Sequence, residues 1–279
     1  MAITEGHTQT RLAETDIDAV MALVAEAGWN QVAEDWRLMA GIGDAVVLRD
    51  AGGAVCASAL ALPYAAGFGW ISMVLVAKAS RRRGLATHLL ADRVAWLKAR
   101  GAVPILDATE LGVPVYEQAG FTGGARLSRW QGVARPGKVR GDLRVAGPSD
   151  RAWIGALDAE VFGADRSRLI DDFLSRPGST GLALDDSGFV IARRGRRATQ
   201  LGPLVAASEP QAIALLDAAL ASLDGPVFFD LFDARGALEA HVRALGYERQ
   251  RGFLRMSLGE MPDFDGNGRA MLIAGPEYG

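Results

Sequence analysis

The chain has 279 residues, which at about 150 residues per domain indicates roughly two domains. Hydrophobic residues make up 49% of the sequence, so there is enough material for a buried core and intrinsic disorder is excluded. The formal charge is −3, from 30 basic and 33 acidic side chains. A protein that binds nucleic acid through its phosphates usually carries a basic surplus, which this composition lacks. We therefore expect no nucleic-acid partner.

The rarer residues limit the chemistry further. The single cysteine, Cys56, has no partner for an intramolecular disulfide, and no Cys/His cluster has the spacing of a zinc site. The three histidines lie far apart in the sequence, so no metal site is predicted. No run of 18 apolar residues occurs, and the first residues lack the order of a signal peptide. These features predict a cytoplasmic protein with no membrane contact.

The first half of the chain alternates between strand and helix patterns. Asp16 stands where an N-cap is expected, before an amphipathic helix. The apolar run 70–77 is typical of a central buried strand. Gly84 precedes a helical repeat of apolar residues, and Gly101 ends it. In chain order, the expected elements are helix 17–27, strands 45–49, 54–62 and 70–77, a helix between Gly84 and Gly101, strand 103–106 and helix 114–118.

The second half repeats this order. A segment near residues 132–142 is rich in Gly, Pro and charge, and we interpret it as a linker. Arginines at 193, 194, 196 and 197 fit a solvated hairpin around a turn. The elements expected after the linker are strands 189–193 and 198–206, helix 210–223 with Ser208 as its candidate cap, strand 227–231, helix 238–245 and strand 253–258.

Equal spacings suggest that the two halves arose by duplication. Thirty positions separate Leu90 from Gly120, and thirty separate Leu216 from Gly246. The difference in length falls in one strand-to-helix loop, 78–83. Chance similarity between two α/β segments is the alternative, but equal spacing over a helix, a strand and a second helix favours duplication.

The loop that differs between the halves has the chemistry of an anion site. Three arginines, at 81, 82 and 83, precede Gly84 and the start of a helix. Unpaired N–H groups and a partial positive charge at a helix N-terminus favour a phosphate. A solvated basic turn is the alternative. No GK[ST] follows, and the segment Gly41-Ile42-Gly43 lacks a third glycine, so a P-loop and a dinucleotide-binding loop are excluded.

Two motifs in a fixed order carry a family resemblance. Met73–Val76 precedes Arg81-Arg82-Arg83-Gly84-Leu85-Ala86, which fits the pattern [QR]-x-x-G-x-[GA]. Further on, Leu106–Thr109 is followed by the run from Val115 to Phe121, which contains Tyr116. Strand, loop, helix, strand and second motif together resemble the GCN5-related N-acetyltransferases (GNAT). The match covers roughly residues 10–132, and 143–258 look like a degenerate second copy.

The resemblance implies an α/β fold of two tandem GNAT-like domains, each a mixed, mostly antiparallel sheet flanked by helices. The implied boundaries are a catalytic domain at 1–132, a linker at 133–142 and a degenerate domain at 143–279. By the same resemblance, central-strand backbone groups pair with the pantetheine arm of acetyl-CoA and loop amides bind its pyrophosphate. The implied cofactor-binding residues are Val74, Leu75, Val76, Arg81, Arg82, Arg83, Gly84, Leu85, Ala86, Thr87 and Thr109.

Tyr116 falls where the family often has a tyrosine that protonates the departing CoA thiolate. A weak acid is needed near the sulfur, and a phenol meets that need. The alternative is an ordinary residue of an amphipathic helix. Many relatives carry an asparagine near the position of Thr109, so this sequence departs from the family there.

The acceptor amine must be deprotonated before it can attack, and a carboxylate acting through water could remove the proton. Glu34, Asp35, Asp107 and Glu110 are candidates among which the sequence does not choose. His88 fits surface or packing better than a base. Relatives commonly build one wall of the acceptor pocket after the first helix, which here implies Trp29, Asn30 and Asp35 as substrate residues.

The second copy lacks the corresponding features. Its loop has neither arginine nor glycine, Glu209 would repel phosphate, Pro210 removes a backbone donor, and Val242 aligns with Tyr116. The prediction is an N-acetyltransferase that moves acetyl from acetyl-CoA to a small-molecule primary amine by direct attack at one site, without a metal. It would act as a monomer or homodimer. A non-catalytic acyl-CoA-binding regulatory module is the alternative, and a protein that keeps only the fold is the third.

Overall fold

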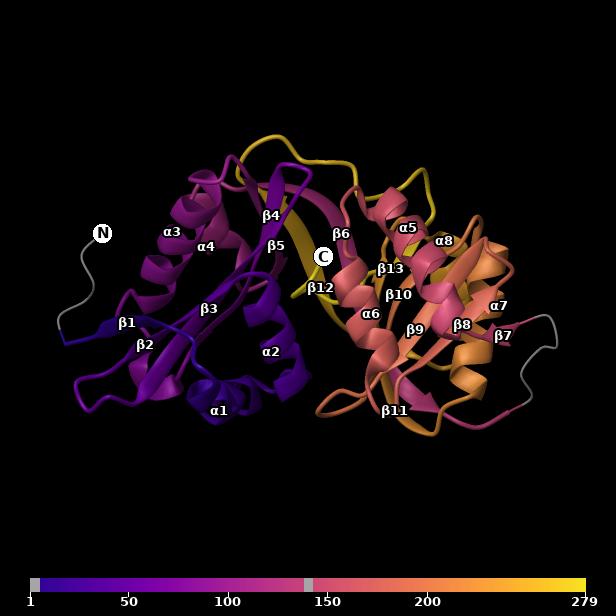
Figure 1. The fold of residues 1–279 in the computed structure, drawn as a ribbon, viewed down its shortest axis with the longest axis horizontal. Coiled ribbons are helices and arrows are strands. Elements are labelled where there is room, and N and C mark those ends of the chain that lie inside the picture. Colours follow the sequence, from indigo (N-terminus) through magenta and orange to yellow (C-terminus); the bar gives the residue numbers. More distant parts are fainter. Residues whose placement is uncertain (1–5, 138–142) are drawn as a thin grey trace.

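The structure is a computed structural model that describes residues 6–137 and 143–279. Two halves lie side by side, and the same series of elements occurs in each (Figure 1). The first half contains β1 (Thr8–Arg11), α1 (Ile17–Ala27), α2 (Ala33–Ile42), β2 (Asp44–Arg49), β3 (Val55–Tyr64), β4 (Phe68–Val76), α3 (Leu85–Lys98), β5 (Val103–Thr109), α4 (Val113–Gln118) and β6 (Thr122–Ala134). The second contains β7 (Arg144–Val145), α5 (Arg151–Phe162), α6 (Ser167–Ser175), β8 (Thr180–Leu184), β9 (Gly188–Arg193), β10 (Thr199–Val205), α7 (Glu209–Ala221), β11 (Gly225–Phe232), α8 (Gly236–Ala244), β12 (Glu248–Ser257) and β13 (Ala270–Leu272).

The halves exchange their last long strands. All the strands form one sheet in the order β1-β2-β3-β4-β5-β12-β6-β11-β13-β10-β9-β8-β7. β12 of the second half pairs with β5 of the first, and β6 of the first half pairs with β11 of the second. β12 and β6 also pair with each other at the centre. Neither half therefore completes its sheet without the other.

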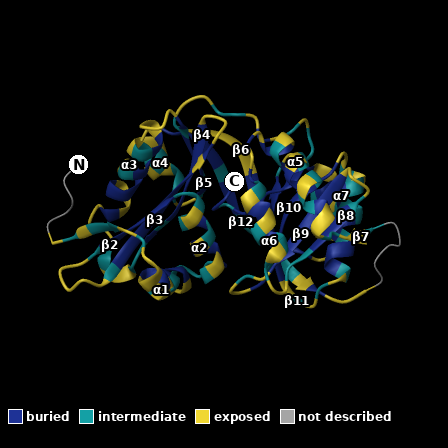
Figure 2. Ribbon diagram, in the orientation of Figure 1, coloured by how far each residue is buried: buried dark blue, intermediate teal, exposed yellow. Residues whose placement is uncertain are grey.

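Helices cover both faces of this sheet. In β2, Val46 and Leu48 pack in the same cluster as α3, whereas Ala45 and Val47 pack in the cluster that contains α1 and α2. This alternation is the two-residue period of a strand whose two faces are both buried. Helices α3, α4, α7 and α8 lie on one face, and α1, α2, α5 and α6 on the other. Figure 2 shows the buried strands at the centre of each half.

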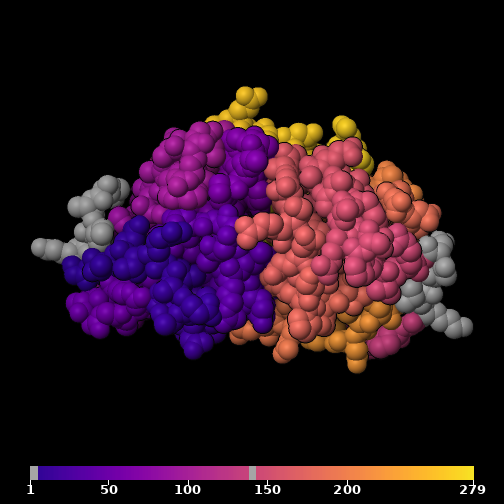
Figure 3. All heavy atoms as spheres, viewed as in Figure 1, coloured from indigo at the N-terminus to yellow at the C-terminus, as the bar shows by residue number. Residues whose placement is uncertain are grey.

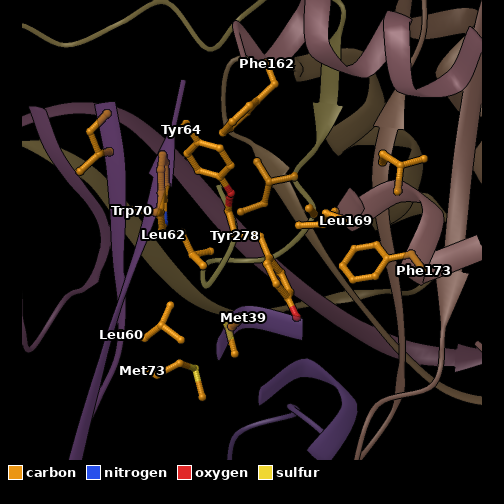
Figure 4. Packing of buried hydrophobic residues seen from close by; sticks show 14 of the residues in the cluster. Met39, Leu60, Leu62, Tyr64, Trp70, Met73, Phe162, Leu169, Phe173 and Tyr278 are labelled. Carbon is orange, nitrogen blue, oxygen red and sulfur yellow. The ribbon is translucent and has the colours of Figure 1, made fainter. Parts of the chain in front are cut away.

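The second face carries one hydrophobic cluster that both halves share. Trp36 and Trp70 from the first half belong to the same cluster as Phe162 and Phe173 from the second. Tyr278 lies between Trp70 and Phe173, with its ring 5.3 Å from that of Phe173 (Figure 4). The space-filling view shows the halves in contact along their whole boundary, with C-terminal residues across the upper rim (Figure 3).

The predicted elements are confirmed, with boundaries that shift by a few residues. Helix α1 has the predicted bounds, but the Asp16 carboxylate accepts from Ala13 N and Arg49 and makes no capping bond to the helix. Ser208 occupies the N-cap of α7, also without a side-chain capping bond. The mixed, mostly antiparallel sheet and the two similar halves agree with the predicted fold class.

The structure differs from the prediction in the linker and in the hairpin of the second half. Strand β6 runs to Ala134, so residues 133 and 134 of the expected linker belong to a strand, and residues 138–142 lie outside those described. The predicted hairpin is present, because β9 and β10 pair antiparallel and Arg194, Arg196 and Arg197 are exposed at its turn, but two details differ from the prediction. Arg193 is buried, and Arg196 and Arg197 donate to the backbone oxygens of Trp29 and Gly28 at 3.0 and 2.8 Å. These bonds fasten the turn of the second half to the first.

Candidate active site

The parallel strands β4 and β5 separate part-way along their length. They pair only where residues 68–70 lie against residues 103–105. Beyond Trp70 and Ile105, β4 continues to Val76 and β5 to Thr109 without pairing with each other. One edge of each strand therefore faces an opening in the sheet.

A bulge in β4 lies beside this opening. Met73 and Val74 together oppose the single β3 residue Ala59. Met73 has a φ of 53°, in the left-handed region, and its carbonyl accepts a hydrogen bond from the Ser58 hydroxyl at 2.9 Å. Bulges of this kind redirect a strand and its neighbouring groups, and they are common beside active sites.

A cavity of about 350 Å³ fills the opening. Part of its wall belongs to the cluster beneath α3 and α4, including Leu106 and Tyr116. Another part, including Met73 and Phe253, belongs to the shared cluster on the opposite face. The cavity therefore passes through the sheet between β4 and β5, so ligands entering from opposite faces could meet inside it.

The predicted anion loop borders this cavity. Gly84, with φ of 74°, stands at the N-cap of α3, and no side chain caps the helix. The first intrahelical bond runs from His88 N to Gly84 O, which leaves the N–H groups of residues 85–87 without helical acceptors. Ala86 lines the cavity. No atom of residues 6–137 or 143–279 lies within 4 Å of a Cβ built on Gly84, so the described part of the chain leaves the space above the helix end open.

The arginines of the loop differ in their surroundings. Arg81 donates to Val76 O at 3.1 Å and lies 3.9 Å from a Glu26 carboxylate oxygen. Arg82 and Arg83 are exposed beside the helix end. The loop therefore combines open backbone donors with accessible positive charge, which suits a phosphate group.

Of the other predicted cofactor and catalytic residues, Val74, Thr109 and Tyr116 line the cavity. Leu75 is buried in the shared cluster, and its side chain does not reach the cavity. Burial raises the pKa of the Tyr116 phenol, so the group stays protonated to higher pH than a tyrosine in water. A neutral phenol beside an apolar wall can donate a proton.

The predicted acceptor residues are only partly brought together. Trp29 lines the cavity. Asn30 lies outside it, donating to Ala198 O at 3.1 Å and accepting from the backbone N–H of Arg197 and Ala198. Asp35 is buried outside the cavity and forms an ion pair with Arg176 at 2.6 Å. Asn30 and Asp35 therefore fasten the two halves to each other.

The candidate bases differ in whether they line the cavity and in whether they are already paired. Asp107 lines the cavity, but both of its oxygens accept from Arg255 at 2.9 Å. Glu34 and Glu110 are exposed and outside the cavity wall. His88 is buried, with Nε2 2.9 Å from Gln9 Oε1, which fits the packing role expected for it. None of the four predicted carboxylates is both free and directed into the cavity.

The structure adds a carboxylate that the sequence did not single out. Glu277 lines the cavity at 5% relative exposure. One carboxylate oxygen lies 3.4 Å from Arg193, and the other is buried with no hydrogen-bond partner in the described structure. Burial raises the pKa of Glu277 against the opposing effect of Arg193; Asp35 raises it further and Arg129 lowers it. No local pattern marks this residue, because its position depends on the path of the chain after β12.

Arg129 of β6 and Arg251 of β12 also line the cavity and were not predicted. Arg129 forms two hydrogen bonds to Asp230, at 2.8 and 2.7 Å. Arg251 has a buried Nε without a partner among the described residues. Burial lowers the pKa of Arg251 to about 10, and the neighbouring Arg129 contributes to that shift. Both arginines reach the cavity only because the two strands are exchanged.

The corresponding opening in the second half is filled by the chain itself. Strands β10 and β11 pair in parallel at residues 199–201 and 227–229 and then separate. Strand β13 enters between them, pairing with Leu204 and Val205 on one side and Leu231 on the other. At the start of α7, a Glu209 carboxylate oxygen accepts from Leu238 N at 2.7 Å. The second half therefore has neither an opening between its parallel strands nor a loop like that before α3.

Two further searches cover residues 6–137 and 143–279. No group of three or more His, Cys, Asp or Glu side chains there could hold a metal ion. No helix in those ranges is both long and apolar enough to cross a membrane.

Comparisons with known proteins agree with the repeated fold. The acetyltransferase (GNAT) family model matches residues 23–121, and an acetyltransferase (GNAT) domain model matches residues 154–267. The uncharacterized N-acetyltransferase YitH of Bacillus subtilis (strain 168) is 24% identical over 247 residues, covering 86% of this chain and 87% of that protein.

Solved structures share the whole arrangement. A protein from Pyrococcus horikoshii is similar over 100% of this chain and 98% of its own, with a TM-score of 0.84 at 19% identity. A tandem GNAT protein from the clavulanic acid biosynthesis pathway is similar over 92% of this chain and 100% of its own, with a TM-score of 0.67 at 16% identity. Each half of the chain matches one GNAT family model. This protein therefore belongs to the GNAT N-acetyltransferase superfamily and contains two GNAT domains in tandem.

Proposed function

We propose that the first domain transfers an acetyl group from acetyl-CoA to a primary amine inside the cavity between β4 and β5. The observation that carries this proposal is that three features lie next to one another: a phosphate-binding helix end, a cavity and a proton donor. Open helix-end donors lie beside Ala86, the cavity begins there and passes through the sheet, and Tyr116 stands in its wall. Membership of an N-acetyltransferase family supports the same activity.

The residues present fit an acyl-CoA donor. The free N–H groups of residues 85–87, with Arg82 and Arg83, would hold the pyrophosphate. The unpaired edge of β4 from Val74 to Val76 would receive the pantetheine amides in the manner of a neighbouring strand. Ser72 supplies a buried hydroxyl in the cavity wall that has no partner among the described residues.

When bound, acetyl-CoA supplies an acetyl group activated as a thioester. The acceptor nitrogen forms a bond to the carbonyl carbon while the carbon–sulfur bond breaks; the nitrogen releases one proton and the sulfur gains one. Tyr116 holds the proton that the sulfur needs, and its raised pKa keeps that proton in place until it is required. The apolar wall around it, including Leu106 and Val74, excludes water that would compete with the amine.

Strand β13 fills the opening between β10 and β11 in the second domain, which supports a single acetyl-CoA site in the protein. Because β13 already pairs with both β10 and β11, a pantetheine arm would have to displace three residues of the sheet. A regulatory module that binds acyl-CoA without transfer would use the same loop, but it would need neither a proton donor nor an acceptor space on the opposite face.

Calorimetric titration with acetyl-CoA tests the proposal. We expect a stoichiometry near one, and loss of binding in Gly84→Glu, because the new carboxylate would stand in the phosphate site. Pro210→Glu is the matched control: it places the same charge in the first turn of α7, and binding should not change. Mass spectrometry with a panel of primary amines then detects transfer. Binding without transfer to any amine would favour the regulatory module, and two sites would contradict the single-site proposal.

A further inference from the structure

The side of the cavity opposite α3 and α4 is built from distant parts of the chain. Gln31 precedes α2, Arg129 comes from β6, Arg251 from β12, and Glu277 from the segment after β13. No GNAT motif of the first half includes these residues. Their convergence depends on the strand exchange and on the return of the C-terminal segment to the first half.

Three of these side chains have unused hydrogen-bonding groups. Within the described structure, Arg251 Nε is a buried donor without an acceptor. Gln31 Oε1 and Glu277 Oε2 are buried acceptors without a donor. Buried polar groups are nearly always paired, and unpaired ones lower stability. The site therefore suits a ligand that offers an acceptor to Arg251 and N–H donors to Glu277 and Gln31.

Of the four charged side chains in the cavity wall, three have a charged partner, and Arg251 has none among the described residues. Two buried bidentate pairs cancel, and Glu277 lies beside Arg193. Arg251 then remains without a carboxylate partner, and a single negative charge on the ligand would neutralise it. A carboxylate has that charge, and its two oxygens match the planar donors of a guanidinium. The three charged pairs in and behind the cavity wall are Arg129 with Asp230, Arg255 with Asp107, and Arg193 with Glu277.

We propose that the acceptor is a small molecule carrying both a primary amine and a carboxylate, with its carboxylate bound by Arg251 and its amine directed to Glu277. This inference rests on the proposed acetyl transfer. Glu277 takes one proton from the bound ammonium, which frees the nitrogen lone pair, and returns that proton to water. The proton released when the carbon–nitrogen bond forms balances the one that the sulfur gains.

The C-terminal segment holds Glu277 in place from both sides. Trp70 Nε1 donates to Pro276 O at 2.9 Å, and the Tyr64 hydroxyl donates to Tyr278 O at 2.6 Å. The Tyr278 hydroxyl in turn donates to Asp35 at 3.0 Å. A Cβ on Gly275 would lie 2.8 Å from a Glu277 carboxylate oxygen, so glycine there leaves room for the carboxylate. These contacts fix the carboxylate with few alternative positions, as proton transfer requires.

The test compares matched acceptors. The panel contains β-alanine, 4-aminobutyrate, 5-aminovalerate and the common L-amino acids, each beside its carboxamide, which keeps the amine and removes the charge. Acetylated products are quantified by mass spectrometry as kcat/KM. Separately, the rise in melting temperature caused by each compound is measured without acetyl-CoA, so acceptor binding is observed independently of turnover.

Two variants assign the roles. Arg251→Gln should lower the preference for the acid over its amide by about 10–100-fold, because one charge-assisted contact is lost. Arg249→Gln is the control on the same strand; Arg249 is exposed and its Nε donates to Ser128, so the preference should stay. Glu277→Gln should lower turnover on every acceptor while leaving acetyl-CoA binding unchanged.

The outcomes separate this inference from the proposed function. A member of the panel that is preferred over its amide, and whose preference and stabilising effect require Arg251, supports the inference. Equal use of acids and amides, with transfer intact, overturns it and leaves the acetyltransferase proposal standing. If no acid stabilises the protein and none is acetylated while acetyl-CoA still binds, the acceptor class is wrong. Failure of acetyl-CoA to bind at all overturns the proposed function itself.

Discussion

Arg255 of β12 and Asp107 of β5 form a buried bidentate ion pair, with both contacts at 2.9 Å, between strands that belong to different halves of the sequence. Arg129 and Asp230 make the equivalent pair between β6 and β11. Arg129 and Arg255 are 126 positions apart (255 − 129), the same separation as Gly120 and Gly246 (246 − 120). Asp107 and Asp230 are 123 positions apart (230 − 107), so the equivalence of the two pairs comes from the strand register, in which each aspartate lies opposite its arginine. Each pair fastens one exchanged strand into the opposite domain.

Removing one member of this pair should strongly destabilise the protein. Arg255→Met leaves the Asp107 carboxylate buried without its partner, and we expect a loss of about 3–5 kcal/mol in the free energy of unfolding. Urea denaturation followed by tryptophan fluorescence measures this, since Trp70 lies beside Arg255. Combining Arg255→Met with Asp107→Leu should restore most of the loss. Arg37→Met, in the exposed pair with Glu14, should have little effect. Equal effects of Arg255→Met and Arg37→Met would contradict this account.

Tyr116→Phe tests the proton donor. Turnover should fall about 100-fold or more, because general acid catalysis typically contributes that much, while the acetyl-CoA dissociation constant changes little. Since burial raises the pKa of Tyr116, the wild-type rate should show no loss from ionisation of this phenol below its ordinary pKa of about 10. A thiol-release assay measures turnover, and calorimetric titration measures the acetyl-CoA dissociation constant. Tyr247→Phe, in the second domain, is the control, and unchanged turnover of Tyr116→Phe at every pH would remove the acid role.

Glu277 should make stability and activity depend on pH in opposite directions. Its native pKa lies above its value in the unfolded chain, so the unfolded state loses the proton first as pH rises, and ionisation favours unfolding. Relative to Glu277→Gln, the wild type should therefore lose melting temperature as pH rises from about 4 through the native pKa. Over the same interval the wild-type kcat/KM should rise, because only the carboxylate accepts a proton. A constant difference in melting temperature across pH would show that the native pKa is not raised.

Gly275→Ala should impair catalysis through position alone. Its φ of 151° is strained for an alanine, and the new Cβ would press on the Glu277 carboxylate at 2.8 Å. We expect turnover to fall about 10–100-fold with little change in acetyl-CoA binding, as small misplacements of a catalytic group do. Gly53→Ala is the control: Gly53 also has a positive φ, at 84°, but a Cβ there meets nothing within 4 Å. If both variants lose the same activity, general backbone strain rather than the position of Glu277 is the cause.

The amino-acid sequence by itself predicted the repeat, the loop before α3 and many of the elements, whereas α2, β6, α5 and α6 were not predicted. Apolar periods and glycine positions identified α1, β4 and α3, because these signals are local and depend on which face of an element is buried. Residues 81–87 were predicted as a phosphate-binding loop for the same reason, because a loop, a glycine and a helix start are contiguous in the chain. Tyr116 came from a motif of neighbouring residues and does line the cavity.

Only the tertiary structure decided which residues line the cavity on the side opposite α3 and α4. Asn30 and Asp35 lie near the first helix as expected, but their polar groups bond to the second half, which no local pattern reveals. Arg251 and Glu277 reach the cavity because β12 crosses into the first domain and the chain returns after β13. Strand exchange is set by long-range pairing and by buried charge pairs, whose partners lie more than a hundred residues apart. A local sequence pattern indicates which face of a helix or strand is buried, whereas the packing of the whole chain decides which residues contact that face.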